Sequence, residues 1–413
     1  MIWPLLIAGV VFLLALWRPK FGVVAVTLLW PAYLIRTTIA GIPTTALELS
    51  IYSLTAATAM SWFRSRQPWP RLPRWLWAWL IVLALGWLTA TVFSSGHRAS
   101  LGALKGWFID SVLYGGALLY TIRTEADRRV LLQALASSGI VIAVAGLAQL
   151  VWWRSTLQDG RLSSFFHPVA NYAAMYLTPL ILITTAALIW KQLPRWWWVT
   201  VGLMTLALIL SVSFAGYLAL ASGAVIIWWF LPDRQVRKRL ALWGLAIALI
   251  SFLGLTQTPY FAEHFRTTDR SSSLVRYQIW RTSWVMIERH PLVGIGPDTF
   301  EPVYRATIPA LFWPPLEWLV SQPHNLYLAL WLETGLLGLI GFVGLVSAWL
   351  VHVWRQRGTS DNHQRAILIG SGAAMVGLLV HGLFDTPYFK NDLILQFMVI
   401  LLLPWLVTKT TSK

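Results

Sequence analysis

A histidine and an asparagine stand side by side in SQPHNLYLALWLETGLLGLIG, residues 321–341, between a polar loop and an apolar run. His324 carries the side chain best suited to accept a proton from a hydroxyl group near neutral pH. Asn325 is typical of a residue that caps the start of a helix. Glu333 follows about three turns deeper, where an ionisable group in an apolar helix suggests a function. The segment alone fits a catalytic histidine and a merely interfacial one equally well.

A second histidine and an aspartate lie near the end of the chain, in HGLFDTPY, residues 381–388. His381 and Asp385 are four residues apart, so they would share one face of a helix. Asp385 could orient another histidine or bind an arginine. The plainer alternative is that His381 and Asp385 pair with each other.

A third polar group opens an earlier apolar run, in RLSSFFHPVANYAAMYL, residues 161–177. It places Arg161, His167 and Asn171 just before or within the start of a helix. Taken alone, Asn171 is better explained as a helix cap, and His167 with the proline after it as a turn.

The composition predicts a membrane protein, because 57% of the 413 residues are hydrophobic and only 12% are charged. Soluble domains have about 25% charged residues. We predict an all-α, polytopic membrane protein of 12–13 transmembrane helices with a large periplasmic loop that contains amphipathic helices. The apolar runs fall at 3–17, 21–35, 46–63, 75–93, 101–121, 130–152, 170–190, 196–212, 214–231, 240–257, 325–354, 366–384 and 392–408.

Composition also limits the chemistry. The chain has no cysteine, which excludes disulfides, thiolate metal sites and a cysteine nucleophile. No Walker, GxGxxG, HExxH or EF-hand motif is present, so we expect neither a metal site nor a cofactor. The net charge is +16, which in a membrane protein indicates contact with anionic lipid and not with nucleic acid.

The distribution of lysine and arginine predicts the topology. Alternate loops assigned to one side hold twenty of these residues, whereas the short loops of the other side hold five. The basic side is therefore expected to be cytoplasmic. The long loop 258–323 then lies on the periplasmic side, between an N-terminal bundle, 1–257, and C-terminal helices, 324–413.

The long loop carries a predicted amphipathic helix, VRYQIWRTSWVMIERHP, in which Arg276, Trp280 and Trp284 recur every four residues. The sequence HPLVGIGPDTF, residues 290–300, predicts a tight turn after it. Arginine matches phosphate oxygens with a planar fork of donors. A solvated face is the alternative for any single arginine, but the set favours a diphosphate on the outer face. Its members are Arg266, Arg270, Arg276, Arg281, Arg289 and Arg305, with Arg161 in the other outer segment.

These motifs together resemble the O-antigen ligase and O-antigen polymerase superfamily. His324, Asn325, nine residues, Gly335, two residues and Gly338 fit that family's histidine signature. The stretch from Arg276 to Phe300 is similar to its periplasmic-loop segment, and RLSSFFHPVANYAA is similar to the stretch that opens an earlier helix. The resemblance covers most of the chain from about residue 130.

The resemblance implies a metal-independent, inverting glycosyltransferase of the GT-C type in the bacterial inner membrane. Such enzymes pass a glycan from undecaprenyl diphosphate to an acceptor hydroxyl on the periplasmic face. The acceptor is a lipid A–core sugar in ligases, another lipid-linked glycan in polymerases, and a protein hydroxyl in a third branch. His324 would be catalytic with Asp385. Arg276, Arg161 and Arg270 would bind the donor diphosphate, and Asn325, Asn171, His381 and Glu333 would support the site. We expect Gly335 and Gly338 to allow close helix packing.

One position departs from the family pattern. Many members carry an arginine at the outer turn between two helices, and Phe214 stands there in this chain. Either Arg161 or another loop arginine would then supply the second charge, or the chain is a divergent branch.

Two other classes of function remain open. A small-anion transporter would place its polar groups near the bilayer midplane, often at broken helices. The candidates here cluster at one surface instead, which favours chemistry on a lipid-linked substrate. A scaffold or lipid-binding protein would turn over no such substrate.

Overall fold

The protein is described by a computed structural model that covers residues 2–157, 161–164, 169–231, 233–239, 272–358 and 361–406. The predicted class is confirmed: the described part is a polytopic helical membrane protein with fifteen α-helices. Five of them are long and apolar enough to cross a membrane: α4 (Arg74–Val92), α7 (Glu125–Trp152), α8 (Ala170–Ile189), α15 (Leu326–Gln356) and α16 (Asn362–His381).

The remaining helices are shorter, or less apolar, than these five. They are α1 (Ile2–Trp17), α2 (Pro19–Leu28), α3 (Ala46–Ser65), α5 (His97–Ala103), α6 (Asp110–Thr121), α9 (Trp198–Leu210), α10 (Phe214–Trp229), α13 (Ser272–Arg289), α14 (Phe300–Thr307) and α17 (Asn391–Leu402). A π-helical turn (Leu104–Ile109) joins α5 to α6. The predicted apolar run 240–257 lies outside the described residues.

One short hairpin is an exception to the all-α prediction. Strands β1 (Arg36–Ile39) and β2 (Ile42–Thr45) pair antiparallel, and Ala40 and Gly41 turn the chain with positive φ angles. Thr45 then caps α3 by accepting the amide of Glu48. Each strand has only four residues, so its alternating pattern was too short to be recognised as a strand in a sequence dominated by apolar helices.

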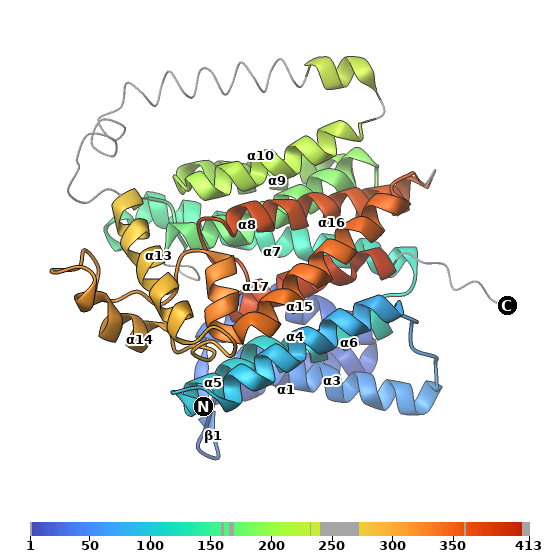
Figure 1. Cartoon of the computed structure of the whole chain (residues 1–413). Coiled ribbons are helices and arrows are strands. Elements are labelled where there is room, and N and C mark those ends of the chain that lie inside the picture. Colours follow the sequence, from blue (N-terminus) through green and yellow to red (C-terminus); the bar gives the residue numbers. More distant parts are fainter. Residues whose placement is uncertain are drawn as a thin grey trace.

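Figure 1 shows the N-terminal helices α1 to α6 gathered on one side of the helices α7 to α10, with α15, α16 and α17 between them. Helices α13 and α14 lie at one end of this bundle. The predicted amphipathic helix of the long loop is confirmed as α13, which ends at Arg289 just before the predicted turn. The predicted division at residues 257 and 323 stays a prediction.

The N-terminus of α15 is fixed by a side-chain cap from Asn325. Asn325 has an extended backbone, and its side-chain oxygen accepts the amides of Tyr327 and Leu328 at 3.0 Å each. This satisfies two of the amides that a helix start leaves unpaired. The predicted cap is therefore confirmed.

Helix α15 is broken at Gly335, which has φ 69° and ψ −179°. The turn 290–300 fills the break: the Ile295 amide donates to Leu332 O at 2.7 Å, and the Leu336 amide donates to Leu292 O at 3.0 Å. A β-carbon on Gly335 would lie 2.5 Å from Leu292 O. We predicted close helix packing for Gly335, and this was wrong, because its neighbour is a loop and its backbone is left-handed.

The second signature glycine does allow close helix packing, as predicted. A β-carbon on Gly86 of α4 would lie 2.4 Å from the backbone of Gly338, so α4 and α15 cross with their main chains nearly in contact. Small residues at such crossings let the backbones approach within a membrane.

Replacing Gly335 by alanine should lower the free energy of unfolding by about 1–3 kcal/mol, the typical cost of a strained left-handed residue. The apparent melting temperature in detergent measures this. Gly116→Ala in α6 is the matched control, because no described atom lies within 4 Å of a β-carbon there. Equal melting temperatures for the two variants would contradict the role given to Gly335.

Candidate active site

The carboxylate of Asp385 is the centre of the polar cluster at one end of the bundle. His324 Nδ1 lies 3.2 Å from Asp385 Oδ1, and Asn171 Nδ2 donates to Asp385 Oδ2 at 3.1 Å. The amide of Thr386 also donates to Oδ1, at 3.1 Å. Three predicted site residues from three separate parts of the chain therefore meet at one carboxylate.

His324 is held in an unusual backbone conformation, with φ 48°. The residues on either side of it fix this conformation. Trp280 of α13 donates from Nε1 to Pro323 O at 3.1 Å and to His324 O at 3.4 Å. The Leu326 amide donates to Gly382 O at 2.7 Å. A left-handed non-glycine residue persists only where its surroundings hold it there, and such residues cluster at functional sites.

Trp280 also explains how the long loop reaches the site. Arg276 precedes it by one helical turn, so anchoring Trp280 on the His324 segment brings Arg276 to the same end of the bundle. The charge of Arg276 acts on both His324 and His381. At His324 it opposes the larger effect of Asp385, so the pKa of His324 still lies above its usual value. The predicted helix face therefore places a guanidinium beside the cluster.

The ionisation of the pair is set by opposing effects. Burial on its own raises the pKa of Asp385, but the hydrogen bond and charge of His324, with the charge of His381 and the Thr386 amide, outweigh it and lower that pKa to about 2. Burial on its own lowers the pKa of His324, whereas the hydrogen bond and charge of Asp385 raise it above the usual histidine value. The His324 side chain is still 37% exposed, so a substrate can reach it.

His381 does not pair with Asp385 as the simpler alternative supposed. Helix α16 ends at His381, and Asp385 lies in the loop beyond, with its amide donating to His381 O at 3.1 Å. The buried ring of His381 makes no hydrogen bond to any described residue. Asp385 is instead engaged by His324 and Asn171.

The predicted helix cap at Asn171 was wrong. Helix α8 has Val169 as its N-cap residue, without a side-chain cap, and Asn171 lies inside the first turn. Its amide is directed to Asp385, a residue 214 positions further along the chain. The stretch 161–164 is held by the Leu162 amide, which donates to Leu210 O at 2.9 Å, and the role of Arg161 in donor binding stays a prediction. Arg270 and His167 lie outside the described residues.

Glu333 does not reach the cluster. It is buried beside the break in α15, where its carboxylate accepts the Asp298 amide at 3.4 Å. It therefore supports the turn that fills the break and does not contact His324. Phe214 is the first residue of α10, 46% exposed, with its ring against Tyr217.

Lys390 is a residue that the sequence analysis missed. It follows the Asp385 segment, and its ammonium lies 3.4 Å from the ring centroid of Tyr172. Its only sequence signal was its position as the single basic residue of a short outer loop, 385–391.

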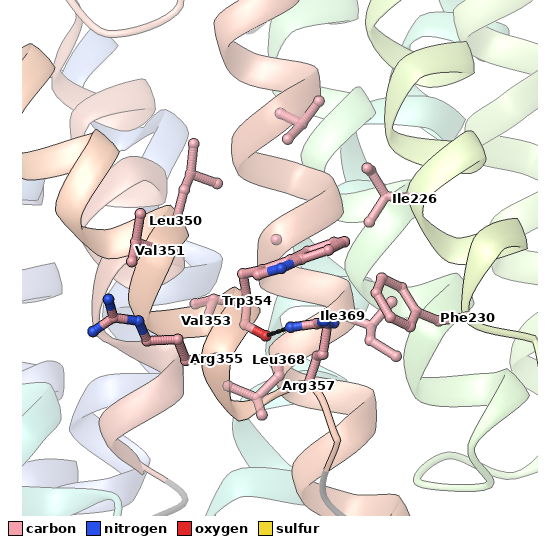
Figure 2. A pocket seen from close by; sticks show the side chains of 12 residues that line it. Ile226, Phe230, Leu350, Val351, Val353, Trp354, Arg355, Arg357, Leu368 and Ile369 are labelled. Atoms are coloured by element: carbon pink, nitrogen blue, oxygen red, sulfur yellow. Dashed lines mark hydrogen bonds between the residues drawn. The ribbon is translucent and has the colours of Figure 1, made fainter.

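A cavity of about 350 Å³ lies at the far end of α15 and is distinct from this cluster. Apolar side chains of α10, α15 and α16 line it, and Figure 2 shows Arg357 at its rim, donating to Trp354 O. The His324 end and the Arg357 end of α15 are separated by roughly 45 Å of helix. The cavity holds none of the predicted site residues.

One part of the chain matches a known protein family. Residues 199–343 match the family model described as O-antigen ligase. This region, less than half of the chain, is similar to the O-antigen ligase family. The matched region contains Arg276, His324 and both signature glycines, whereas Asn171 and Asp385 join the site from outside it.

A relative from Haemophilus influenzae, an uncharacterized protein, is 22% identical over 258 residues. The match covers 59% of this chain and 64% of the relative, so the chain spans less than two thirds of that protein's length.

The ionisation of His324 can be tested without a substrate. Diethyl pyrocarbonate modifies only unprotonated imidazole, so labelling of His324 should rise with pH around a pKa above the usual value of about 6.5. Asp385→Asn removes the carboxylate that raises the pKa of His324, so the midpoint of the labelling curve should move to lower pH. Mass spectrometry of the labelled peptides gives both curves. An unchanged midpoint in Asp385→Asn would contradict the pairing; labelling of the exposed His97 reports general reactivity.

Proposed function

We propose that the protein is an O-antigen ligase-like glycosyltransferase that moves a glycan from undecaprenyl diphosphate to an acceptor hydroxyl. The acceptor is most simply a lipid A–core sugar, and the site faces the periplasm of the inner membrane. The observation that carries the proposal is the exposed imidazole of His324, held by the buried Asp385 beside Arg276.

The proposed reaction is a single displacement. With Nδ1 of His324 donating to Asp385, the lone pair of Nε2 is available to take the proton from the acceptor hydroxyl. The acceptor oxygen then forms a bond to the anomeric carbon as the bond from that carbon to the diphosphate breaks. Attack from the face opposite the leaving group inverts the anomeric configuration.

The diphosphate leaves with the electron pair of the broken bond, so its negative charge increases in the transition state. Arg276 is suited to stabilise this charge, because a preorganised guanidinium in a partly dry site costs little reorganisation. Asp385 orients His324 and stabilises the imidazolium that forms. Asn171 and the Thr386 amide hold the carboxylate in place.

The break in α15 does not favour a transporter. Broken helices in transporters expose backbone groups to an ion or substrate. Here the groups freed at Gly335 bond to the turn 290–300, and Glu333 accepts a backbone amide from the same turn. The break therefore has the features of a docking point for the long loop.

Replacing His324 by alanine should lower the rate of glycan transfer by about 10²–10⁴-fold, the usual contribution of a general base. Purified protein would be incubated with undecaprenyl-diphosphate glycan and lipid A–core, and the products separated on a gel. His97→Ala removes an exposed histidine from α5 as a control. Transfer by a folded His324→Ala variant at the wild-type rate would refute the proposal.

The pattern of products separates the related activities. One addition to lipid A–core indicates a ligase, a ladder on the lipid-linked donor indicates a polymerase, and addition to a protein hydroxyl indicates the third branch.

Replacing Arg276 by alanine should weaken donor binding by about tenfold or more, since a charge-assisted hydrogen bond contributes about 1.5–3 kcal/mol. Titration with undecaprenyl-diphosphate glycan measures this. Arg305→Ala, in the exposed part of α14, removes an arginine from the same loop as a matched control. A donor affinity unaltered in Arg276→Ala would argue against a guanidinium–diphosphate contact.

A further inference from the structure

Lys390 lies between the site and the start of α17, and its ammonium has no carboxylate in direct contact among the described residues. No hydrogen bond or ion pair of its ammonium is found among the described residues. Its ammonium contacts aromatic rings instead, 3.4 Å from the centroid of Tyr172 and 5.5 Å from that of Tyr33. Such contacts stabilise a desolvated cation but do not cancel its charge.

Two carboxylates lie near this ammonium without reaching it. The carboxylates of Asp392 and Asp385 raise the pKa of Lys390, yet burial is the larger effect and lowers that pKa overall. Asp385 is already engaged by three donors. Two other lysines form ion pairs: Lys105 lies 2.7 Å from Glu48 and Lys20 lies 3.2 Å from Asp127. Lys390 differs from both.

The main chain at Lys390 is fixed by the same loop that carries His324. Gln322, two residues before His324, donates from Nε2 to Phe389 O at 2.9 Å, and its side-chain oxygen accepts the hydroxyl of Thr386. Just after Lys390, the side chain of Asn391 accepts from Trp107 Nε1 at 3.2 Å. The lysine is therefore held in one rigid unit with His324 and Asp385.

A partly buried cation with no anion in direct contact is costly, and an anionic ligand would supply that contact. We propose that the ammonium of Lys390 binds a phosphate of the lipid-linked donor and acts with Arg276 as the second cation of the diphosphate site. This rests on the proposed function. Tyr172 and Tyr33 limit the positions of the flexible side chain, so the ammonium is aimed before the donor arrives.

Lys390 adjoins Tyr172, the residue that follows Asn171 in the first turn of α8. The next turn of α8 packs against the start of α10, where a β-carbon on Gly216 would lie 2.9 Å from the side chain of Ala174. The start of α10 carries Phe214 and presents no cation there. Lys390, the residue just before α17, thus places a positive charge next to the first turn of α8, where Asn171 contacts Asp385.

The test measures binding of undecaprenyl diphosphate, without a glycan, to the full-length protein in nanodiscs. Lys390→Gln should raise the dissociation constant by about 10- to 100-fold, and Lys390→Arg should stay near the wild-type value. Arg98→Gln is the matched control, because it removes one positive charge from exposed α5 outside the site. Should Lys390→Gln fail to fold, Lys390→Met keeps the apolar stem against the tyrosines and should give the same rise.

A neutral probe separates charge from packing. Undecaprenol should bind wild-type and Lys390→Gln proteins equally, and an equal loss of both lipids would mean that Lys390 only supports the fold. Wild-type affinity for undecaprenyl diphosphate in a folded Lys390→Gln or Lys390→Met variant would overturn the proposal. The proposed function is tested separately, by glycan transfer with the wild-type protein. Transfer by the wild-type protein would support the function even if Lys390 proved unimportant for binding, whereas absence of transfer would contradict the function.

Discussion

The buried carboxylate of Asp385 joins the parts of the chain that make the site. It receives His324 from the start of α15, Asn171 from the first turn of α8, and the adjacent backbone amide of Thr386. A carboxylate buried to this degree is stable as an anion only when donors and positive charge surround it. The requirement to satisfy Asp385 therefore couples the starts of α8 and α15, and the loop after α16, to the orientation of one imidazole.

The break at Gly335 is the second constraint. It lets the turn 290–300 enter α15 and exchange two backbone hydrogen bonds with it. Helix α13, just before that turn, is then held at two points: by the turn after its last residue and, near its middle, by Trp280 on the His324 segment. The ten residues between His324 and Gly335 thus separate two attachment points of the long loop, and this spacing sets where Arg276 lies.

The sequence alone allowed the candidate site residues to be selected, but it did not predict which residues they contact. His324 and Asp385 could be selected because ionisable residues at the ends of apolar runs are rare. Asn325 could be recognised as a cap, since capping depends only on neighbours in sequence. The four-residue spacing of Arg276 and Trp280 correctly placed both on one helix face.

Other features depend on contacts that no local pattern encodes. The partner of Asn171 lies 214 residues away, so a cap was the reasonable local prediction. The apolar pattern continues through Gly335, and only the arrival of the 290–300 turn explains the break. Lys390 stands out only once its surroundings are known to hold no anion in contact with it. Residues 240–271, including Arg270, lie outside this description.

The central claim is that donor diphosphate and acceptor hydroxyl meet at His324, between the long loop and the Asp385 segment. A cryo-electron microscopy structure of His324→Ala with undecaprenyl-diphosphate glycan tests it most directly, because the variant should hold the donor without consuming it. The account predicts diphosphate density in contact with Arg276 and the anomeric carbon facing the vacated imidazole position. Diphosphate density at the opposite end of α15, near Arg357, would contradict it.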